Sequence, residues 1–274
     1  MSSYKNNLSK HAFFEEINQN LNPLIESFAP KLINLSKEGK IRNTDEENLF
    51  EQEWYDFMVW KYTNSLILGV SRLEYSQKFL KTFPRPQQYQ RLGIYQQNWN
   101  EYHYSYYVVT LVSLLDIALI LTNAVFRLGN REIDCKPDVI MKNAWVKQTN
   151  VQKNLVLLEK TVQPDKHNRN LHVHRGELQR IHSVLNCKEV ADLIDLADLV
   201  SSVQRTGEQY VDPKTVDKMY RLANKKLISQ MQEQTKKLQS VISLLFDDLL
   251  PVYREKSTEL HNKWDELTTK IKRS

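Results

Sequence analysis

The longest helical pattern of the chain, residues 211–250, limits what it can fold into more than any other feature. Mostly apolar positions recur along it every seven residues in two interleaved series, a spacing typical of packed helices. This seam predicts a helical hairpin or a short coiled coil, and we expect Pro251 to end the helix. The seam consists of Ile228, Met231, Thr235, Leu238, Ile242, Leu245 and Leu249.

Residues that form turns are scarce, since the chain has 6 glycines and 8 prolines among 274 residues. Few turns over this length favour few, long elements and therefore an all-α fold. No GxGxxG or GxxxxGK[ST] loop is present, so the common nucleotide-binding α/β folds have no support in the sequence. The hydrophobic share of 41% and the charged share of 26% are normal for a soluble globular protein.

Further helical patterns cover residues 10–36, 50–83, 96–128, 138–163 and 186–203. We expect Pro23 and Pro30 to divide the first of these patterns. Gly129 is a suitable stop for the third, and Pro164 for the fourth.

No Gly/Ser linker or break in composition separates two domains. We therefore expect one α-helical unit with an N-terminal helical extension in residues 1–48 and a helical domain in residues 49–205. Residues 206–274 would form a long helix or hairpin that packs on the same unit.

Residues 108–126 form an apolar run that approaches the length of a membrane span. Asp116 lies at its centre, where a charge costs a membrane helix about 2.5–3.5 kcal/mol. A buried central helix of a soluble bundle is therefore the favoured interpretation, with a membrane helix as the alternative. Asp116, Asn123 and Arg127 lie close to one face of this helix and need partners if they are buried.

The net charge of +5 permits an anionic partner without requiring one. Cys135 and Cys187 cannot build a disulfide framework and fit a reducing compartment. The first residues, MSSYKNNLSKHAFFEE, lack the apolar run of a secretory signal. We expect a cytoplasmic protein with no membrane partner.

The stretch RNLHVHR, residues 169–175, collects protonatable side chains that ordinarily repel one another. It is either an exposed basic turn or a site for an anion. Arginine offers a fixed cationic fork for phosphate, and histidine exchanges a proton near neutral pH. Together they suffice to transesterify RNA without a metal, whereas DNA lacks the 2′-OH that this reaction needs. A zinc site is a weaker alternative without acidic or cysteine partners, and its ligands would be His167, His172, His174 and His182.

Helix geometry restricts how this cluster can act. In one helix, positions 169 and 174 lie about 140° apart round the axis, whereas 169 and 172 share a face. Arg169 and His174 could therefore converge only in a turn that opens a helix, or through a second copy of the chain. We expect the cluster to open a helix capped by Asp165 or Asn168.

The hexapeptide RNLHVH, residues 169–174, resembles the R-N-x-x-x-H form of the HEPN superfamily motif. The resemblance covers residues 50–205, with a long apolar helix, a second helix and then the motif at the start of a later helix. It implies an HEPN-like helical bundle, here with additional N- and C-terminal helices, that dimerises so that two motifs share one cleft. Many members of this superfamily are metal-independent endoribonucleases, often toxins or abortive-infection effectors, and others are non-catalytic binding modules.

Carried onto this chain, the resemblance makes Arg169 and His174 the catalytic pair and Asn170 a residue that orients the site. His172, Arg175 and Asp116 would support the pair, Asp116 by holding an arginine or histidine of the cluster. The resemblance implies neither a cofactor nor a metal. The implied partners are RNA and a second copy of the chain, and an antitoxin or nucleotidyltransferase is left open.

The alternative function is a non-catalytic helical interaction module that binds a partner through the seam. Two further features fit either function. One is a cluster of His103 with Tyr102, Tyr104, Tyr106 and Tyr107, which would form core and dimer contacts or a stacking surface for bases. The other is a basic stretch, which would be a solvated helix face or a grip on RNA, formed by Lys214, Lys218, Arg221, Lys225, Lys226, Lys236 and Lys237.

Overall fold

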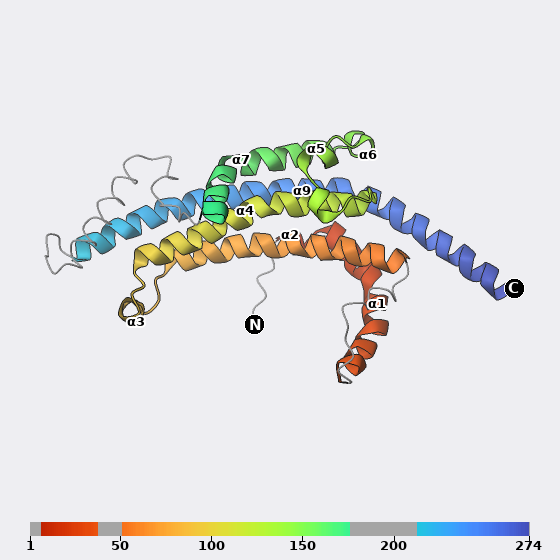
Figure 1. Ribbon diagram of the computed structural model, residues 1–274, viewed down its shortest axis with the longest axis horizontal. Coiled ribbons are helices and arrows are strands. Elements are labelled where there is room, and N and C mark those ends of the chain that lie inside the picture. Colours follow the sequence, from red (N-terminus) through yellow and green to blue (C-terminus); the bar gives the residue numbers. More distant parts are fainter. Residues whose placement is uncertain (1–6, 38–50, 176–212, 274) are drawn as a thin grey trace. The chain divides into compact units, whose positions relative to one another are not determined.

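The computed structural model describes residues 7–37, 51–175 and 213–273, and Figure 1 traces its helices along the chain. Every regular element among these residues is a helix, which confirms the all-α prediction. In chain order the elements are η1 (Asn7–Lys10), α1 (Ala12–Lys37), α2 (Glu51–Lys81), α3 (Pro86–Arg91), α4 (Gln96–Phe126), η3 (Glu132–Asp134), α5 (Pro137–Ile140), α6 (Ala144–Lys147), α7 (Val151–Arg175) and α9 (Pro213–Arg273). The predicted helix at 186–203 lies outside the described residues.

The chain divides into two compact units, and α2, α4, α7 and α9 each contribute residues to both. Unit 1 consists of Met1–Leu68, Leu114–Glu159 and Gln239–Ser274. Unit 2 consists of Gly69–Ser113 and Lys160–Leu238. The predicted domain boundaries after residues 48 and 205 fall outside the described residues.

The core of unit 1 joins α1 to α9 through aromatic side chains. The ring of Phe13 lies 5.2 Å from that of Phe246 and 5.9 Å from that of Tyr253, measured between centroids. Phe13 and Ile17 are fully buried, one turn apart on α1. This apolar stripe explains why the N-terminal helix packs against the C-terminal one.

The core of unit 2 contains a layer of paired polar groups. Gln77 of α2 donates to the Thr235 hydroxyl at 2.7 Å, and the Tyr107 hydroxyl donates to the Met231 carbonyl at 3.1 Å. Asn100 of α4 donates to Asn224 of α9 at 3.0 Å. Because buried polar groups are costly without partners, these bonds fix how α2 and α4 pack on α9.

The seam residues of α9 are all buried, as the heptad pattern predicts for a packed face. Of the two alternatives for residues 206–274, the structure shows the long helix and not the hairpin, because Pro213–Arg273 is one helix. The predicted stop at Pro251 is wrong, since Pro251 lies inside this helix. Pro23 and Pro30 likewise lie inside α1, and Pro164 inside α7, so none of them divides or stops its helix. Pro23, Pro164 and Pro251 are exposed, as are the residues four positions before them, so water can reach the carbonyls that lose a helical hydrogen bond.

The helix expected at 138–163 is replaced by the short helices α5 and α6, followed by the start of α7. Asn143 caps α6, because its side chain accepts a 2.9 Å hydrogen bond from the Trp145 amide. The Thr149 hydroxyl donates to the Val146 carbonyl at 2.8 Å and closes the end of α6. Local side-chain bonds thus divide the predicted helix.

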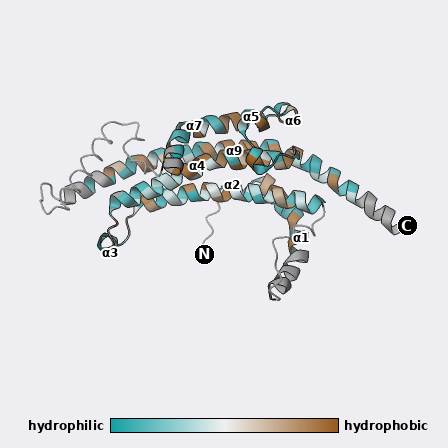
Figure 2. Ribbon diagram, viewed as in Figure 1, coloured by the Kyte–Doolittle hydropathy of each residue, from teal (hydrophilic) through white to brown (hydrophobic). Residues whose placement is uncertain are grey.

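Helix α4 carries the apolar run, and Figure 2 shows polar residues at its start and apolar ones further along. By length and composition alone, Asn98–Phe126 could cross a membrane, and 56% of its most apolar window is buried in the structure. Leu111, Leu114 and Leu115 are among its fully or almost fully buried side chains. These positions fit the expected core helix of a bundle.

Candidate functional site

The RNLHVHR cluster forms the last two turns of α7 and does not open a helix as predicted. Asp165 and Asn168 lie inside α7 and are not caps. The reason is that α7 continues through Pro164, where the sequence predicted a stop. The side chain of Arg169 is half-buried and that of Asn170 is exposed, whereas those of His172, His174 and Arg175 are outside the described set.

The continuous helix fixes the relative directions of the cluster positions. Positions 169 and 174 are separated by about 140° round the α7 axis, and positions 169 and 172 by about 60°. One copy of the helix therefore presents the two predicted catalytic positions to different sides. A second copy of the chain is the remaining route to a shared site that the sequence analysis named.

A buried carboxylate lies one turn before Arg169. Asp165 accepts a 2.6 Å hydrogen bond from the Gln234 side chain of α9. Burial raises the pKa of the Asp165 carboxyl, and the bond from Gln234 partly offsets this rise. The Gln234 side chain in turn accepts from the Tyr107 hydroxyl at 3.2 Å. This chain of contacts joins the end of α7 to α9 and α4 within unit 2.

The predicted polar stripe of α4 is not buried at its first position, because Asp116 is exposed. Arg127 is also exposed and pairs with Glu51, so it is a solvent-facing arginine at a helix end. Asn123 accepts from the Asn130 amide at 3.1 Å and holds the turn after α4. The stripe needed buried partners only if it was buried, and the structure shows the alternative of a helix-end arginine in solvent. Contact of Asp116 with the RNLHVHR cluster stays a prediction.

No three His, Cys, Asp or Glu side chains are grouped to hold a metal ion among the residues that the structure describes. Of the histidines in the zinc alternative, the side chain of His167 alone is described, and it is exposed. That alternative is not tested at His172, His174 and His182.

The basic stretch of α9 is exposed, which both of its predicted alternatives require. Between positions 218 and 237 its cationic side chains are all exposed, whereas the seam on the same helix is buried. The side chain of Lys214 is outside the described set. We call this surface the basic face, and it consists of Lys218, Arg221, Lys225, Lys226, Lys236 and Lys237.

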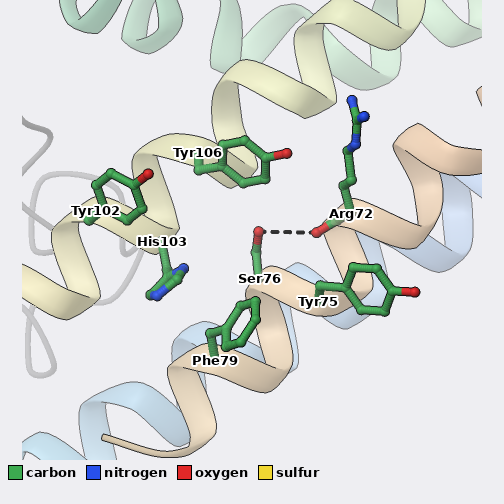
Figure 3. Close-up of a pocket in the computed structure, with 7 residues that line it drawn as sticks. All are labelled: Arg72, Tyr75, Ser76, Phe79, Tyr102, His103 and Tyr106. Carbon is green, nitrogen blue, oxygen red and sulfur yellow. Dashed lines mark hydrogen bonds between the residues drawn. The ribbon is translucent and has the colours of Figure 1, made fainter. Parts of the chain in front are cut away.

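An aromatic pocket of about 260 Å³ lies between α2 and α4 in unit 2. Figure 3 shows side chains from the two helices facing one another across it. Its lining residues are Arg72, Tyr75, Ser76 and Phe79 from α2 and Tyr102, His103 and Tyr106 from α4. The α2 residues are spaced i, i+3, i+4 and i+7 and therefore share one helix face.

His103 is held in this pocket by stacking. Its ring lies 4.8 Å from that of Phe79 in a stacked arrangement and 4.4 Å from that of Trp99 at an angle of 65°. The Trp99 indole donates to the Phe79 carbonyl at 2.9 Å, which ties the start of α4 to the end of α2. Burial lowers the pKa of His103 and favours the neutral ring.

The tyrosines singled out in the sequence separate into two groups. Tyr104 and Tyr107 are buried in the core, as one of the two alternatives predicted. Tyr102 and Tyr106 are 65% and 41% exposed and border the pocket. Sequence analysis missed the α2 half of the pocket, although the spacing of Arg72, Tyr75 and Phe79 indicated a shared face.

Comparison of the chain with protein-family models, with curated proteins and with solved structures yields no match. Function is therefore inferred from the side chains and their geometry.

Proposed function

We propose that the chain is an RNA-binding protein with an HEPN-like helical bundle. The protein would cut RNA without a metal ion, and Arg169 and His174 would carry out the reaction. The observation that carries this proposal is the run of arginine and histidine in the last turns of α7. The basic face, an exposed cationic surface, belongs to the same compact unit. It would attract phosphates at long range, and the run would supply groups that act on one phosphate and one proton.

The proposed reaction is a transesterification. His174 of one chain takes the proton from a ribose 2′-OH, whose oxygen attacks the adjacent phosphorus. The bond from phosphorus to the 5′ oxygen breaks, and that oxygen takes a proton from water, to which the protonated His174 then returns its own proton. The guanidinium of Arg169 stabilises the charge that develops on the phosphoryl oxygens. The products are a 2′,3′-cyclic phosphate and a 5′-OH.

A homodimer is part of the proposal, because positions 169 and 174 face different sides of one helix. In such a site, arginine from one chain would act with histidine from the other. Asn170, His172, Arg175 and Asp116 keep the supporting roles proposed for them.

The first test compares wild-type protein with Arg169→Ala and His174→Ala on single-stranded and structured RNA in EDTA, with 2′-O-methyl RNA as a control. We expect wild-type cleavage to cyclic phosphate ends, and no cleavage by either variant or of the methylated strand. Circular dichroism verifies that the variants keep their helices. Full activity in both variants would refute the assignment.

The dimer is tested by mixing the two inactive variants under conditions of subunit exchange. If the two residues act from different chains, each mixed dimer regains one intact site, since each variant supplies the residue that the other lacks. Failure to regain activity, with mixed dimers verified by mass, would place the pair within one chain.

We also propose a cytoplasmic location and a role as a toxin or phage-defence effector. An antitoxin or a nucleotidyltransferase would then inhibit the ribonuclease activity. The non-catalytic module with the seam as its partner surface has less support, because the seam residues are buried within the chain.

A further inference from the structure

The aromatic pocket of α2 and α4 is not used by the proposed cleavage reaction. We propose that it binds one unpaired base of an RNA strand, stacked on its tyrosines, with an adjoining phosphate on Arg72. This inference rests on the proposed action on RNA and adds a second contact with the same substrate.

The exposed rings are the first argument. Tyr102, Tyr106, Tyr75 and Phe79 are between 39% and 65% exposed, so each ring still offers part of its surface to a ligand. All four border one pocket, so a flat ligand that enters it would meet aromatic rings from both helices. Stacking on aromatic side chains is how single-stranded nucleic acid is held, because every base has a flat face.

Size and polarity narrow the ligand. A volume of about 260 Å³ is just below the range of about 300–1,000 Å³ for pockets of drug-sized ligands, which fits a single base better than a larger group. The neutral His103 ring offers one donor and one acceptor to a base edge. Buried Ser76 donates to the Arg72 carbonyl at 3.1 Å, so its hydroxyl is already occupied (Figure 3).

Charge selects between the two classes of ligand that aromatic rings favour. A cage of tyrosines also suits a quaternary ammonium group. Here, however, the lining contains Arg72 and no carboxylate. The Lys78 ammonium already lies 5.5 Å from the centre of the Tyr75 ring. Arg72 and Lys78 would repel a cationic ligand, and they favour a ligand that carries phosphate.

The test uses a 2′-O-methyl RNA oligomer, which cannot be cleaved, with a central 2-aminopurine whose fluorescence falls when it stacks. We expect wild-type protein to quench the probe. The Tyr102→Ala/Tyr106→Ala double variant should bind at least about fivefold more weakly and lose the quenching. Tyr102→Phe keeps the ring and should keep the quenching, whereas Arg72→Gln should weaken binding and flatten its salt dependence. Trp145→Ala is the matched control, because Trp145 is 69% exposed and lies in unit 1.

The outcomes separate this inference from the proposed function. Cleavage by wild type with unchanged quenching in the tyrosine variant overturns the base pocket alone. Quenching that the tyrosine variant loses, without cleavage of ordinary RNA, supports the pocket and overturns the cleavage reaction. Binding of a choline-containing probe in place of the oligomer would assign a cation cage. Loss of self-association in the tyrosine variant, with oligomer binding unchanged, would assign an interface between copies.

Discussion

Tyr253 donates a 2.7 Å hydrogen bond to Asp56, and both side chains are buried in unit 1. Asn20 of α1 donates to the same phenol at 2.8 Å, so Tyr253 joins α1, α2 and α9 through one oxygen atom. Burial raises the pKa of the Asp56 carboxyl more than the bond from Tyr253 lowers it. The carboxyl is thus more costly to ionise in the folded chain than in the unfolded one.

This raised pKa predicts a pH-dependent stability. Below the ordinary aspartate range, Asp56 is protonated in folded and unfolded chains and adds no pH dependence. As the pH rises through the raised pKa, the cost of a buried charge lowers the free energy of unfolding. The side chain that Asp56→Asn introduces cannot ionise. We therefore expect the free energy of unfolding of this variant, relative to wild type, to increase as the pH rises from about 4 to about 8. Urea unfolding at both values measures this difference, and a constant difference would contradict the prediction.

Helices α3 and α4 end in the same way but with different residues in the left-handed position. Gly93 has φ +74° after α3, and Arg127 has φ +54° after α4. In both cases the residue that follows donates to a carbonyl five positions back, from Ile94 to Tyr89 and from Leu128 to Asn123. This conformation favours glycine, so the position of Arg127 is strained.

We expect Gly93→Ala to lower the free energy of unfolding by about 1 kcal/mol. A new Cβ at Gly93 would meet no atom within 4 Å, so the backbone conformation alone causes the loss. Arg127→Gly should instead raise the free energy of unfolding, because glycine relieves the strain. The comparison is made in a Glu51→Gln background, with and without Arg127→Gly, so that loss of the ion pair between Arg127 and Glu51 does not contribute. Thermal unfolding of the paired variants measures the two effects, and equal signs would exclude backbone strain as the cause.

The sequence predicted the long helices well because their signals are repeated over many residues. The patterns at 50–83 and 96–128 became α2 and α4 with ends shifted by two residues or fewer. Predictions from single residues were wrong where the effect of the residue depends on its exposure to solvent. Whether Pro164 or Pro251 stops a helix depends in part on whether water reaches the freed carbonyl, and the sequence does not show which face of a helix meets water.

For the aromatic pocket, too, the sequence indicated what is local and missed what depends on tertiary packing. Tyr102, His103 and Tyr106 are close in sequence and were singled out together, whereas Arg72 and Phe79 come from another helix. A contact such as that between Phe79 and His103 depends on the register of α2 against α4. That register is held by core contacts such as those that Gln77 of α2 and Tyr107 of α4 both make with Thr235 of α9, which no local pattern reveals.

The buried seam predicts how substitutions in α9 act. Leu245 is fully buried, whereas its neighbour Leu244 is 49% exposed. We expect Leu245→Ala to cost about 2–5 kcal/mol of unfolding free energy, because it leaves a cavity in the core. Leu244→Ala should change it by less than about 0.5 kcal/mol. Chemical denaturation measures both, with sedimentation at equal concentration as a second readout. Loss of assembly by Leu245→Ala at unchanged stability would instead identify the seam as a partner surface.

The basic face predicts a salt-dependent affinity for RNA. Lys218, Lys225 and Lys237 are exposed along α9, and replacing them with alanine removes three charges from one surface. If each lysine contacts a phosphate of a single strand, the slope of log affinity against log salt should become shallower by up to about 2. Fluorescence anisotropy with the 2′-O-methyl oligomer over a salt series measures this slope.

The matched control removes the same charge from unit 1, through Lys136→Ala, Lys142→Ala and Lys147→Ala, at three positions that are equally solvent-facing. If net charge alone attracts the RNA, the slope should change equally in the two triple variants, because both lose three positive charges. A change confined to the α9 variant would locate the phosphate contacts on the basic face. An equal change in both would show that the mild positive charge of the whole chain, and no particular surface, attracts the RNA.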